Sequence, residues 1–162
     1  MAYPTYVAVI GPGEATDDEL ASAEAIGRLL AERGATVISG GLGGVMAAAA
    51  RGATRAGGIA VGILPGADRA AGNRWLTVAL PTGLGELRNG LVIRSADAVI
   101  AIGGAYGTLS EIGLALKAKT PVIGLRTWEI DGIEQVDSAE QAVEHALRRA
   151  PERSAPDQRH ST

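Results

Sequence analysis

Cysteine and phenylalanine are absent from the sequence, and aromatic residues make up only 3% of it. Without cysteine the chain cannot form disulfides, use a thiol nucleophile or hold a metal through thiolates. With so few aromatic residues, the hydrophobic core must be built from alanine, valine, isoleucine and leucine. This composition favours a parallel β-sheet that is closely covered by helices.

Long apolar runs and targeting signals are also missing. No stretch approaches the ~20 apolar residues of a membrane span, and residues 1–5 lack the pattern of a signal peptide. The two histidines, His145 and His160, have no metal-ligand spacing. The net charge of −3 argues against a general nucleic-acid-binding protein. We therefore expect a cytoplasmic protein with no membrane or nucleic-acid partner, no metal site and no cofactor.

The sequence has enough apolar residues for one core, since 46% of its 162 residues are hydrophobic. Apolar runs alternate with helical patterns over residues 1–150, whereas residues 151–162 are polar, carry two prolines and show no periodicity. We expect one folded domain over residues 1–150 and a flexible tail over residues 151–162.

The folded part alternates between strand and helix signals along its whole length. Two capping boxes mark helix starts, one formed by Thr16 and Glu19 and the other by Ser138 and Gln141. Strands are predicted at residues 6–10, 36–39, 59–63, 75–80, 97–102, 121–125 and 133–136, and helices at 17–33, 45–56, 84–95, 108–117 and 139–149. This order predicts a Rossmann-like, doubly wound parallel sheet with helices on both faces.

Three glycine-rich stretches, residues 11–13, 40–44 and 103–107, each follow a predicted strand. The carboxyl ends of parallel strands lie at one edge of the sheet, where ligands of such folds bind. Glycine lets the backbone approach a ligand closely, and a helix N-terminus attracts anions. The three stretches together predict an anion site at this edge.

Two common nucleotide motifs are missing. The segment Gly11-Pro12-Gly13 lacks the third glycine of the dinucleotide fingerprint, and no acidic residue for a ribose ends the next strand. No Gly-Lys-Ser/Thr sequence exists for a P-loop. The chain is therefore not predicted to be a classical NAD enzyme or a P-loop protein.

Glu111 has two interpretations. It lies close to the predicted anion site, where its charge would repel a phosphate, so it either faces away or takes part in chemistry. Thr108 and Glu111 also have the spacing of a capping box, in which the carboxylate only caps its helix. The spacing alone does not decide between them.

Arg88 stands in an apolar stripe of the helix predicted at residues 84–95, together with Leu84, Leu87, Leu91 and Val92. A guanidinium in such a stripe needs a partner, which can be a ligand anion, a carbonyl or a carboxylate such as Glu111. The alternative is a side chain that extends to solvent at the edge of the stripe.

Two stretches carry a resemblance to a known family. Residues 39–46 (SGGLGGVM) and 103–111 (GGAYGTLSE) resemble the two signatures of the LOG proteins, long labelled "possible lysine decarboxylases". The resemblance implies a Rossmann-like, nucleotide-binding homodimer that hydrolyses nucleoside 5′-monophosphates to the free base and ribose 5-phosphate. It places Arg88 and Glu111 on the catalytic arginine and glutamate, and Asp97 on an aspartate at a strand start.

The predicted phosphate- or nucleotide-binding residues are Gly11, Gly13, Ser39, Gly40, Gly41, Gly43, Gly44, Met46, Gly103, Gly104, Gly107 and Thr108. Three positions depart from the family pattern: Gly103 replaces a proline, Ala105 replaces a glycine and Asn89 replaces a lysine. With these departures the chain resembles a shorter bacterial branch, a relative of which carries the molybdenum cofactor without hydrolysing it.

Two functions follow from the resemblance. The first is a phosphoribohydrolase in which Glu111 stabilises an oxocarbenium-like state and Arg88 supports Glu111 or the leaving base. The second is a non-catalytic carrier or sensor of a phosphorylated pterin or nucleotide. A purely structural dimer is disfavoured by the joint presence of Arg88, Thr108 and Glu111. Lysine decarboxylation is disfavoured because Lys117 and Lys119 lie away from the glycine loops.

Overall fold

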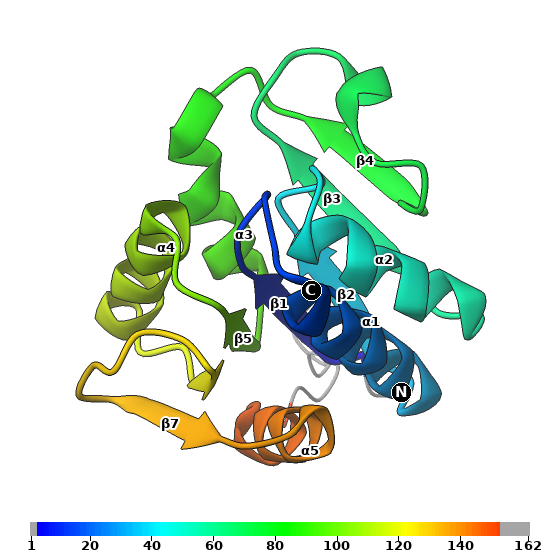
Figure 1. The fold of residues 1–162 in the computed structure, drawn as a ribbon. Coiled ribbons are helices and arrows are strands. Elements are labelled where there is room, and N and C mark those ends of the chain that lie inside the picture. Colours follow the sequence, from blue (N-terminus) through cyan, green and yellow to red (C-terminus); the bar gives the residue numbers. More distant parts are fainter. Residues whose placement is uncertain (1–2, 153–162) are drawn as a thin grey trace, which may run out of the picture.

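The computed structural model describes residues 3–152, so most of the predicted tail at residues 151–162 lies outside the described residues. Seven parallel strands form one sheet in the order β4-β3-β2-β1-β5-β6-β7 (Figure 1). The strands are β1 (Tyr6–Ile10), β2 (Thr36–Ser39), β3 (Ala60–Leu64), β4 (Val78–Pro81), β5 (Ala98–Ile102), β6 (Val122–Leu125) and β7 (Ile133–Val136). The predicted Rossmann-like parallel sheet is confirmed.

Five α-helices cover the two faces of this sheet (Figure 1). They are α1 (Asp17–Glu32), α2 (Val45–Arg55), α3 (Asn89–Ser95), α4 (Tyr106–Lys117) and α5 (Ala139–Arg149), and two 3₁₀ turns, η1 (Arg69–Ala71) and η2 (Gly85–Arg88), lie between strands. Helices α1, α2 and α5 pack on one face, and α3 and α4 on the other. Within residues 3–152, no helix reaches the length and hydrophobicity that a membrane span requires.

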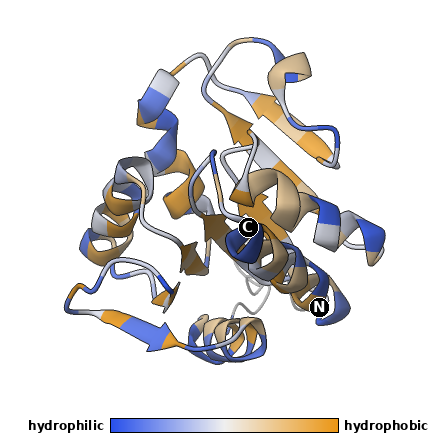
Figure 2. Ribbon diagram, viewed as in Figure 1, coloured by the Kyte–Doolittle hydropathy of each residue, from blue (hydrophilic) through white to orange (hydrophobic). Residues whose placement is uncertain are grey.

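Alternate residues of the central strands supply two separate cores. On β1, Val7 and Val9 pack under α1 and α2, whereas Ala8 and Ile10 pack under α3. Figure 2 shows the result, with hydrophobic residues along the strands and hydrophilic residues on the outer sides of the helices. Burial on both faces explains why these strands have continuous apolar sequences.

The strand order reverses between β1 and β5. The chain moves outward from β1 through β2, β3 and β4, then returns to place β5 on the other side of β1. The loops that leave the carboxyl ends of β1, β2 and β5 contain the three glycine-rich stretches. In doubly wound sheets this reversal point is the usual ligand site.

Most predicted elements lie within two residues of the observed ones, and both predicted capping residues, Thr16 and Ser138, cap their helices. The helix predicted at residues 84–95 is wrong in its first half, which is the 3₁₀ turn η2. Gly83 and Gly85 adopt positive φ angles of 67° and 59°, so the chain turns there and helical geometry begins only afterwards.

The predicted apolar stripe around Arg88 is also wrong. The leucines of this stripe are exposed rather than packed, and Leu87 is 80% exposed. Similarly, the strand predicted at residues 75–80 is reduced to β4, because residues 74–75 form a turn.

Helices α1 and α2 approach each other through glycine. A Cβ atom on Gly27 of α1 would overlap the carbonyl oxygen of Ala49, and one on Gly52 of α2 would overlap that of Glu24. The small residues of α2 thus allow close contact with α1 as well as with the sheet. Because the obstacles are backbone atoms, no side-chain rotation could relieve the clash.

We expect Gly27→Ala and Gly52→Ala each to destabilise the protein by about 1–3 kcal/mol or more, because overpacked interiors force backbone shifts. Gly113 is the matched control, since it lies within α4 and an added Cβ would meet nothing within 4 Å. Gly113→Ala should stabilise the protein by about 0.5–1 kcal/mol. Urea unfolding of the three variants measures this, and equal effects at all three positions would contradict the close-contact explanation.

Candidate functional site

Arg88 is the buried charge of the carboxyl edge. It lies where η2 meets α3 and is only 8% exposed. Its Nε donates to the carbonyl oxygen of Ile63 (2.9 Å), its Nη1 to Oδ1 of Asn89, and its Nη2 to the carbonyl oxygen of Gly40 (3.4 Å). Burial lowers the pKa of Arg88, while Glu111 and Glu86 raise it. The guanidinium keeps its charge, since arginine titrates far above neutral pH.

Gly40 leaves room for this arrangement of Arg88. A Cβ on Gly40 would lie 2.7 Å from Nη2 of Arg88 and 3.0 Å from Sδ of Met46. Gly40, the first glycine of the predicted phosphate motif, therefore lies against the Arg88 guanidinium, and Met46 packs beside it. Both residues thus have a structural role at the base of the site.

Glu111 lies on α4, faces the same charge and is 8% exposed. Burial raises the pKa of the Glu111 carboxyl from 4.5 to about 7, and the positive charge of Arg88 opposes this rise. The interpretation of Glu111 as a helix cap is wrong. Helix α4 begins at Tyr106 with Ala105 as its N-cap, so Glu111 lies in the second turn, beyond the reach of a cap.

Thr108 is the second buried polar residue of α4 and lies one turn before Glu111. Its side chain is 1% exposed, and its hydroxyl has no hydrogen-bond partner among the described residues. An unsatisfied buried hydroxyl costs about 1–3 kcal/mol. Because the hydroxyl has almost no accessible surface, a ligand oxygen would reach it only after a small local movement of α4 or of its side chain.

The loops after β1 and β2 lie against each other. The backbone N–H of Val45 donates to the carbonyl oxygen of Pro12 (3.1 Å). Gly44 has a φ of 62°, and a Cβ there would overlap the carbonyl oxygens of Pro12 and Gly13. Gly43 is more open, with the carbonyl oxygen of Gly13 at 3.9 Å from a Cβ.

The loop after β5 joins the same cluster. A Cβ on Gly11 would lie 2.8 Å from the carbonyl oxygen of Ile102, and one on Gly103, whose φ is 68°, would overlap the Glu19 carboxylate. Pro12 Cδ would lie 3.1 Å from that same Cβ on Gly103. The three glycine stretches therefore converge at the reversal point, as their positions after strands indicate.

Two glycines of the β5 loop remain accessible. A Cβ on Gly107, in the first turn of α4, would meet nothing within 4 Å, and one on Gly104 would lie 3.8 Å from Nε1 of Trp128. Helix α4 also begins without a side-chain cap, which leaves its first N–H groups open to another acceptor.

Two predicted residues lie away from this cluster. The Ser39 hydroxyl accepts a hydrogen bond from the Gly41 N–H (3.1 Å), and the Gly41 carbonyl accepts one from the Asn73 N–H (2.9 Å). A Cβ on Gly41 would press on Leu64 and Gly62 of β3. Ser39 and Gly41 therefore shape the turn after β2.

Asp97 lies at the opposite edge of the sheet. Its Oδ2 accepts a hydrogen bond from the Tyr6 N–H (2.9 Å), and its N–H donates to the Tyr6 carbonyl (2.8 Å). It joins the amino ends of β1 and β5. Within residues 3–152, no three histidine, aspartate or glutamate side chains are grouped so that they could hold a metal ion.

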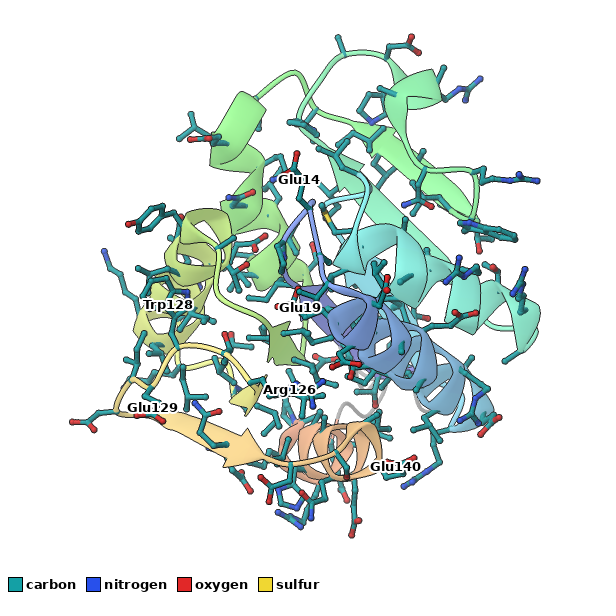
Figure 3. All side chains as sticks on the ribbon, viewed as in Figure 1. Glu14, Glu19, Arg126, Trp128, Glu129 and Glu140 are labelled. Atoms are coloured by element: carbon teal, nitrogen blue, oxygen red, sulfur yellow. The ribbon has the colours of Figure 1, made fainter. Side chains whose placement is uncertain are left out.

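Several residues at the carboxyl edge of the sheet are not predicted from the sequence. The Thr127 hydroxyl donates to the Gly103 carbonyl (2.5 Å), and Trp128 Nε1 donates to the Ala105 carbonyl (3.3 Å). The indole also stacks with the exposed ring of Tyr106 at 6.1 Å. Figure 3 shows Trp128 beside α4 and Glu19 at the start of α1. Their position in the sequence could have revealed them. Residues 126–132 follow a predicted strand and therefore leave the sheet at its carboxyl edge.

The fold and this edge define a Rossmann-like α/β protein with three converging glycine loops. The model of the SLOG cluster4 family matches residues 4–153, so the chain belongs to that family. This result confirms the LOG-related family predicted from the two glycine motifs.

Three similar proteins extend the comparison. An uncharacterised protein of Archaeoglobus fulgidus is 39% identical over 142 residues, which cover 87% of this chain and 93% of that protein. The structure of the molybdenum cofactor binding protein of Rippkaea orientalis is similar with a TM-score of 0.86 and 35% identity, covering 90% of this chain and 97% of that one. The molybdenum cofactor carrier protein of Chlamydomonas reinhardtii gives a TM-score of 0.82 and 28% identity, covering 90% and 98%.

Glu111 makes stability depend on pH. Because its pKa is raised on folding, its contribution is complete below pH 4.5 and is lost as pH rises through 7. The rise from 4.5 to about 7 corresponds to a loss on the order of 3 kcal/mol. We expect Glu111→Gln to raise the melting temperature by several degrees at pH 8, with little change at pH 4.5.

The exposed Glu129 in the β6–β7 loop provides the control. Differential scanning calorimetry of Glu111→Gln and Glu129→Gln between pH 4.5 and 8 separates the two positions. If the melting temperature of Glu111→Gln follows that of the parent at every pH, the pKa of the Glu111 carboxyl is not raised in the folded protein.

Proposed function

We propose that the carboxyl edge binds the phosphate of a phosphorylated heterocycle, and that the protein carries a phosphorylated pterin of the molybdenum cofactor type. The observation that carries this proposal is the buried Thr108 hydroxyl, which has no partner among residues 3–152 and lies in the first turn of an uncapped helix. Similarity to proteins that bind or carry the molybdenum cofactor supports the choice of ligand.

The first turn of α4 would hold the phosphate. Its free N–H groups and the helix dipole favour an anion, Gly107 leaves room for close approach, and the Thr108 hydroxyl supplies a further hydrogen bond. Gly104 extends this surface toward Trp128. The same contacts would serve the phosphate of a nucleotide.

The state of Glu111 removes a difficulty with this site. A fully ionised carboxylate one turn from a phosphate would repel it, but a carboxyl with a pKa of about 7 is largely neutral in slightly acidic solution. The positive charge of Arg88 attracts a bound anion directly, although it lowers the pKa of Glu111. The Glu111 carboxyl and a bound phosphate can therefore lie close together at the carboxyl edge.

The contacts of Arg88 favour carriage over hydrolysis. Three of its five N–H donors are directed to Ile63, Asn89 and Gly40. An arginine fixed in this way supplies charge to the site but has little freedom to form hydrogen bonds with a leaving base. Asn89, which replaces the lysine of the family pattern, holds it by a side-chain hydrogen bond.

The second candidate is a nucleoside 5′-monophosphate phosphoribohydrolase. A specific observation favours it, since a carboxyl with a pKa of about 7 is suited to general acid–base catalysis at neutral pH. In this reaction Glu111 would orient the ribose hydroxyls or water and stabilise an oxocarbenium-like state.

An assay with AMP and other nucleoside monophosphates distinguishes the two. We expect a ligand-dependent rise in melting temperature without release of free base on chromatography. Thr108→Val should weaken binding at least tenfold, because it removes the hydroxyl, whereas Thr108→Ser should keep most of it. Base release by the parent but not by Glu111→Gln would overturn carriage and establish the hydrolase. No binding of any nucleoside monophosphate would overturn the hydrolase and the phosphate site on α4.

We also propose a homodimer, as the family resemblance implies. Three exposed leucines provide the apolar surface that a second copy would cover. They are Leu84 just before η2 (47% exposed), Leu87 on η2 (80%) and Leu91 on α3 (42%). We expect Leu87→Asp to convert a dimer to a monomer in light scattering after gel filtration. Ile59→Asp, the same change at another exposed apolar residue, is the control and should leave the dimer intact. A parent that is monomeric at high concentration would contradict the proposal.

A further inference from the structure

A second pocket lies on the other side of the glycine loops, between the β1 loop, α2 and the turn before β4. It has a volume of about 360 Å³, and its wall includes Gly13, Glu14, Gly44, Ala47, Arg51 and Trp75. None of the residues Arg88, Thr108 and Glu111 lines it. We name it the Trp75 pocket. Its volume lies at the small end of the range for small-molecule sites.

A specific set of hydrogen bonds holds Trp75 beside the β2 loop. The Asn73 side-chain amide donates to the carbonyl oxygens of Gly41 (3.3 Å) and Leu42 (3.0 Å). Its Oδ1 accepts from the Trp75 N–H (3.0 Å). The backbone of Trp75 is therefore held near the β2 loop by contacts between two distant parts of the chain.

Two guanidinium groups lie over this indole, and a third, that of Arg51, belongs to the pocket wall. Arg55 and Arg74 each have their guanidinium carbon 5.0 Å from the Trp75 ring centroid. Arg51 and Arg55 share one carboxylate, that of Glu24, at 2.6 and 3.4 Å. No ion pair to Arg74 is found within residues 3–152. Even with Glu14 at the rim, which Figure 3 shows on the β1–α1 loop, positive charge is in excess.

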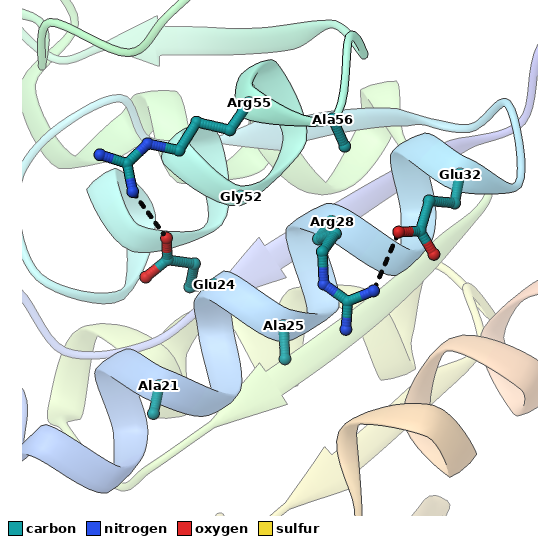
Figure 4. A pocket seen from close by; sticks show the side chains of 8 residues that line it. All are labelled: Ala21, Glu24, Ala25, Arg28, Glu32, Gly52, Arg55 and Ala56. Carbon is teal, nitrogen blue, oxygen red and sulfur yellow. Dashed lines mark hydrogen bonds and ion pairs between the residues drawn. The ribbon is translucent and has the colours of Figure 1, made fainter.

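The neighbouring groove between α1 and α2 shows the contrast. It is larger, about 570 Å³, but its charged side chains pair with one another (Figure 4). Arg28 binds Glu32 at 2.9 Å, and Arg55 binds Glu24 at 3.4 Å. The groove offers no aromatic ring, and each of its two arginines has a carboxylate partner. The Trp75 pocket has both an aromatic wall and surplus positive charge.

We infer that the Trp75 pocket is a second binding site for an anion with a flat aromatic ring, of mononucleotide size. The ring packs against the part of the indole that lines the pocket, and bases commonly contact tryptophan in nucleic-acid-binding proteins. The anionic group lies toward Arg51 and the uncapped start of α2 at Gly44 and Ala47. This inference does not rest on the proposed function, because the two sites have separate charged groups.

The two tryptophans of the chain allow each site to be observed alone. Trp128→Phe leaves Trp75 as the fluorescent residue, and Trp75→Phe leaves Trp128 beside the β5 loop. In Trp128→Phe we expect AMP to quench the fluorescence saturably. Ribose 5-phosphate and inorganic phosphate should act at least tenfold more weakly, because they lack the ring.

Variants in the Trp128→Phe background test the location. Ala47→Leu fills the pocket without changing charge and should abolish the response. Ala56→Leu, at the other end of α2 and exposed, should keep it. Arg51→Gln should weaken binding at least tenfold, whereas Thr108→Val should leave it unchanged.

Three results would overturn the inference. They are the absence of quenching by AMP, equal quenching in Ala47→Leu, and equal binding of inorganic phosphate. A response to AMP confined to Trp75→Phe and lost with Thr108→Val would likewise overturn it, and would support the site on α4 instead.

Discussion

The carboxyl edge depends on the burial of one positive charge, the guanidinium of Arg88. A buried ion is tolerated only when its hydrogen-bonding groups and its charge are both compensated. Here carbonyl oxygens of Ile63 and Gly40 take up two donors, and the nearby Glu111 carboxyl offsets the charge. Arg88 thereby ties the start of α3 to the ends of β2 and β3. It also explains why the β2 loop begins with a glycine, since any side chain there would meet the guanidinium.

Burial, opposed by the same charge, determines the state of Glu111. Desolvation alone favours the neutral acid, whereas Arg88 favours the carboxylate, and the balance places the pKa near 7. An acidic residue beside a predicted phosphate site looks contradictory in the sequence. In the folded protein its charge is adjustable, so it is compatible both with a bound anion and with acid–base chemistry. The choice between a carrier and a hydrolase therefore turns on how Arg88 is held rather than on Glu111 alone.

The sequence predicts the strands, the glycine loops and their meeting at one edge, because these follow from local patterns and from the geometry of parallel sheets. Arg88 is predicted to need a buried partner, but for the wrong reason, since its neighbouring leucines are exposed. Positive φ angles at Gly83 and Gly85 redirect the chain, and helical periodicity carries no trace of them. Thr108 and Glu111 match a capping box in spacing, yet α4 begins two residues earlier. The strand predicted to begin at Trp75 is wrong there, because the position of Trp75 depends on Asn73 contacts with a loop some thirty residues away.

Pro12 is the link between the two sides of this edge. Its carbonyl oxygen accepts the Val45 N–H at the start of α2, while its ring lies against Gly103 in the loop before α4. The segment between β1 and α1 thus separates the α4 site from the Trp75 pocket and contacts the loops that form both. Because glycines on either side leave no room for a Cβ, this segment cannot shift toward one loop without a backbone clash. The β1–α1 segment around Pro12 therefore helps to fix the geometry of both the α4 site and the Trp75 pocket.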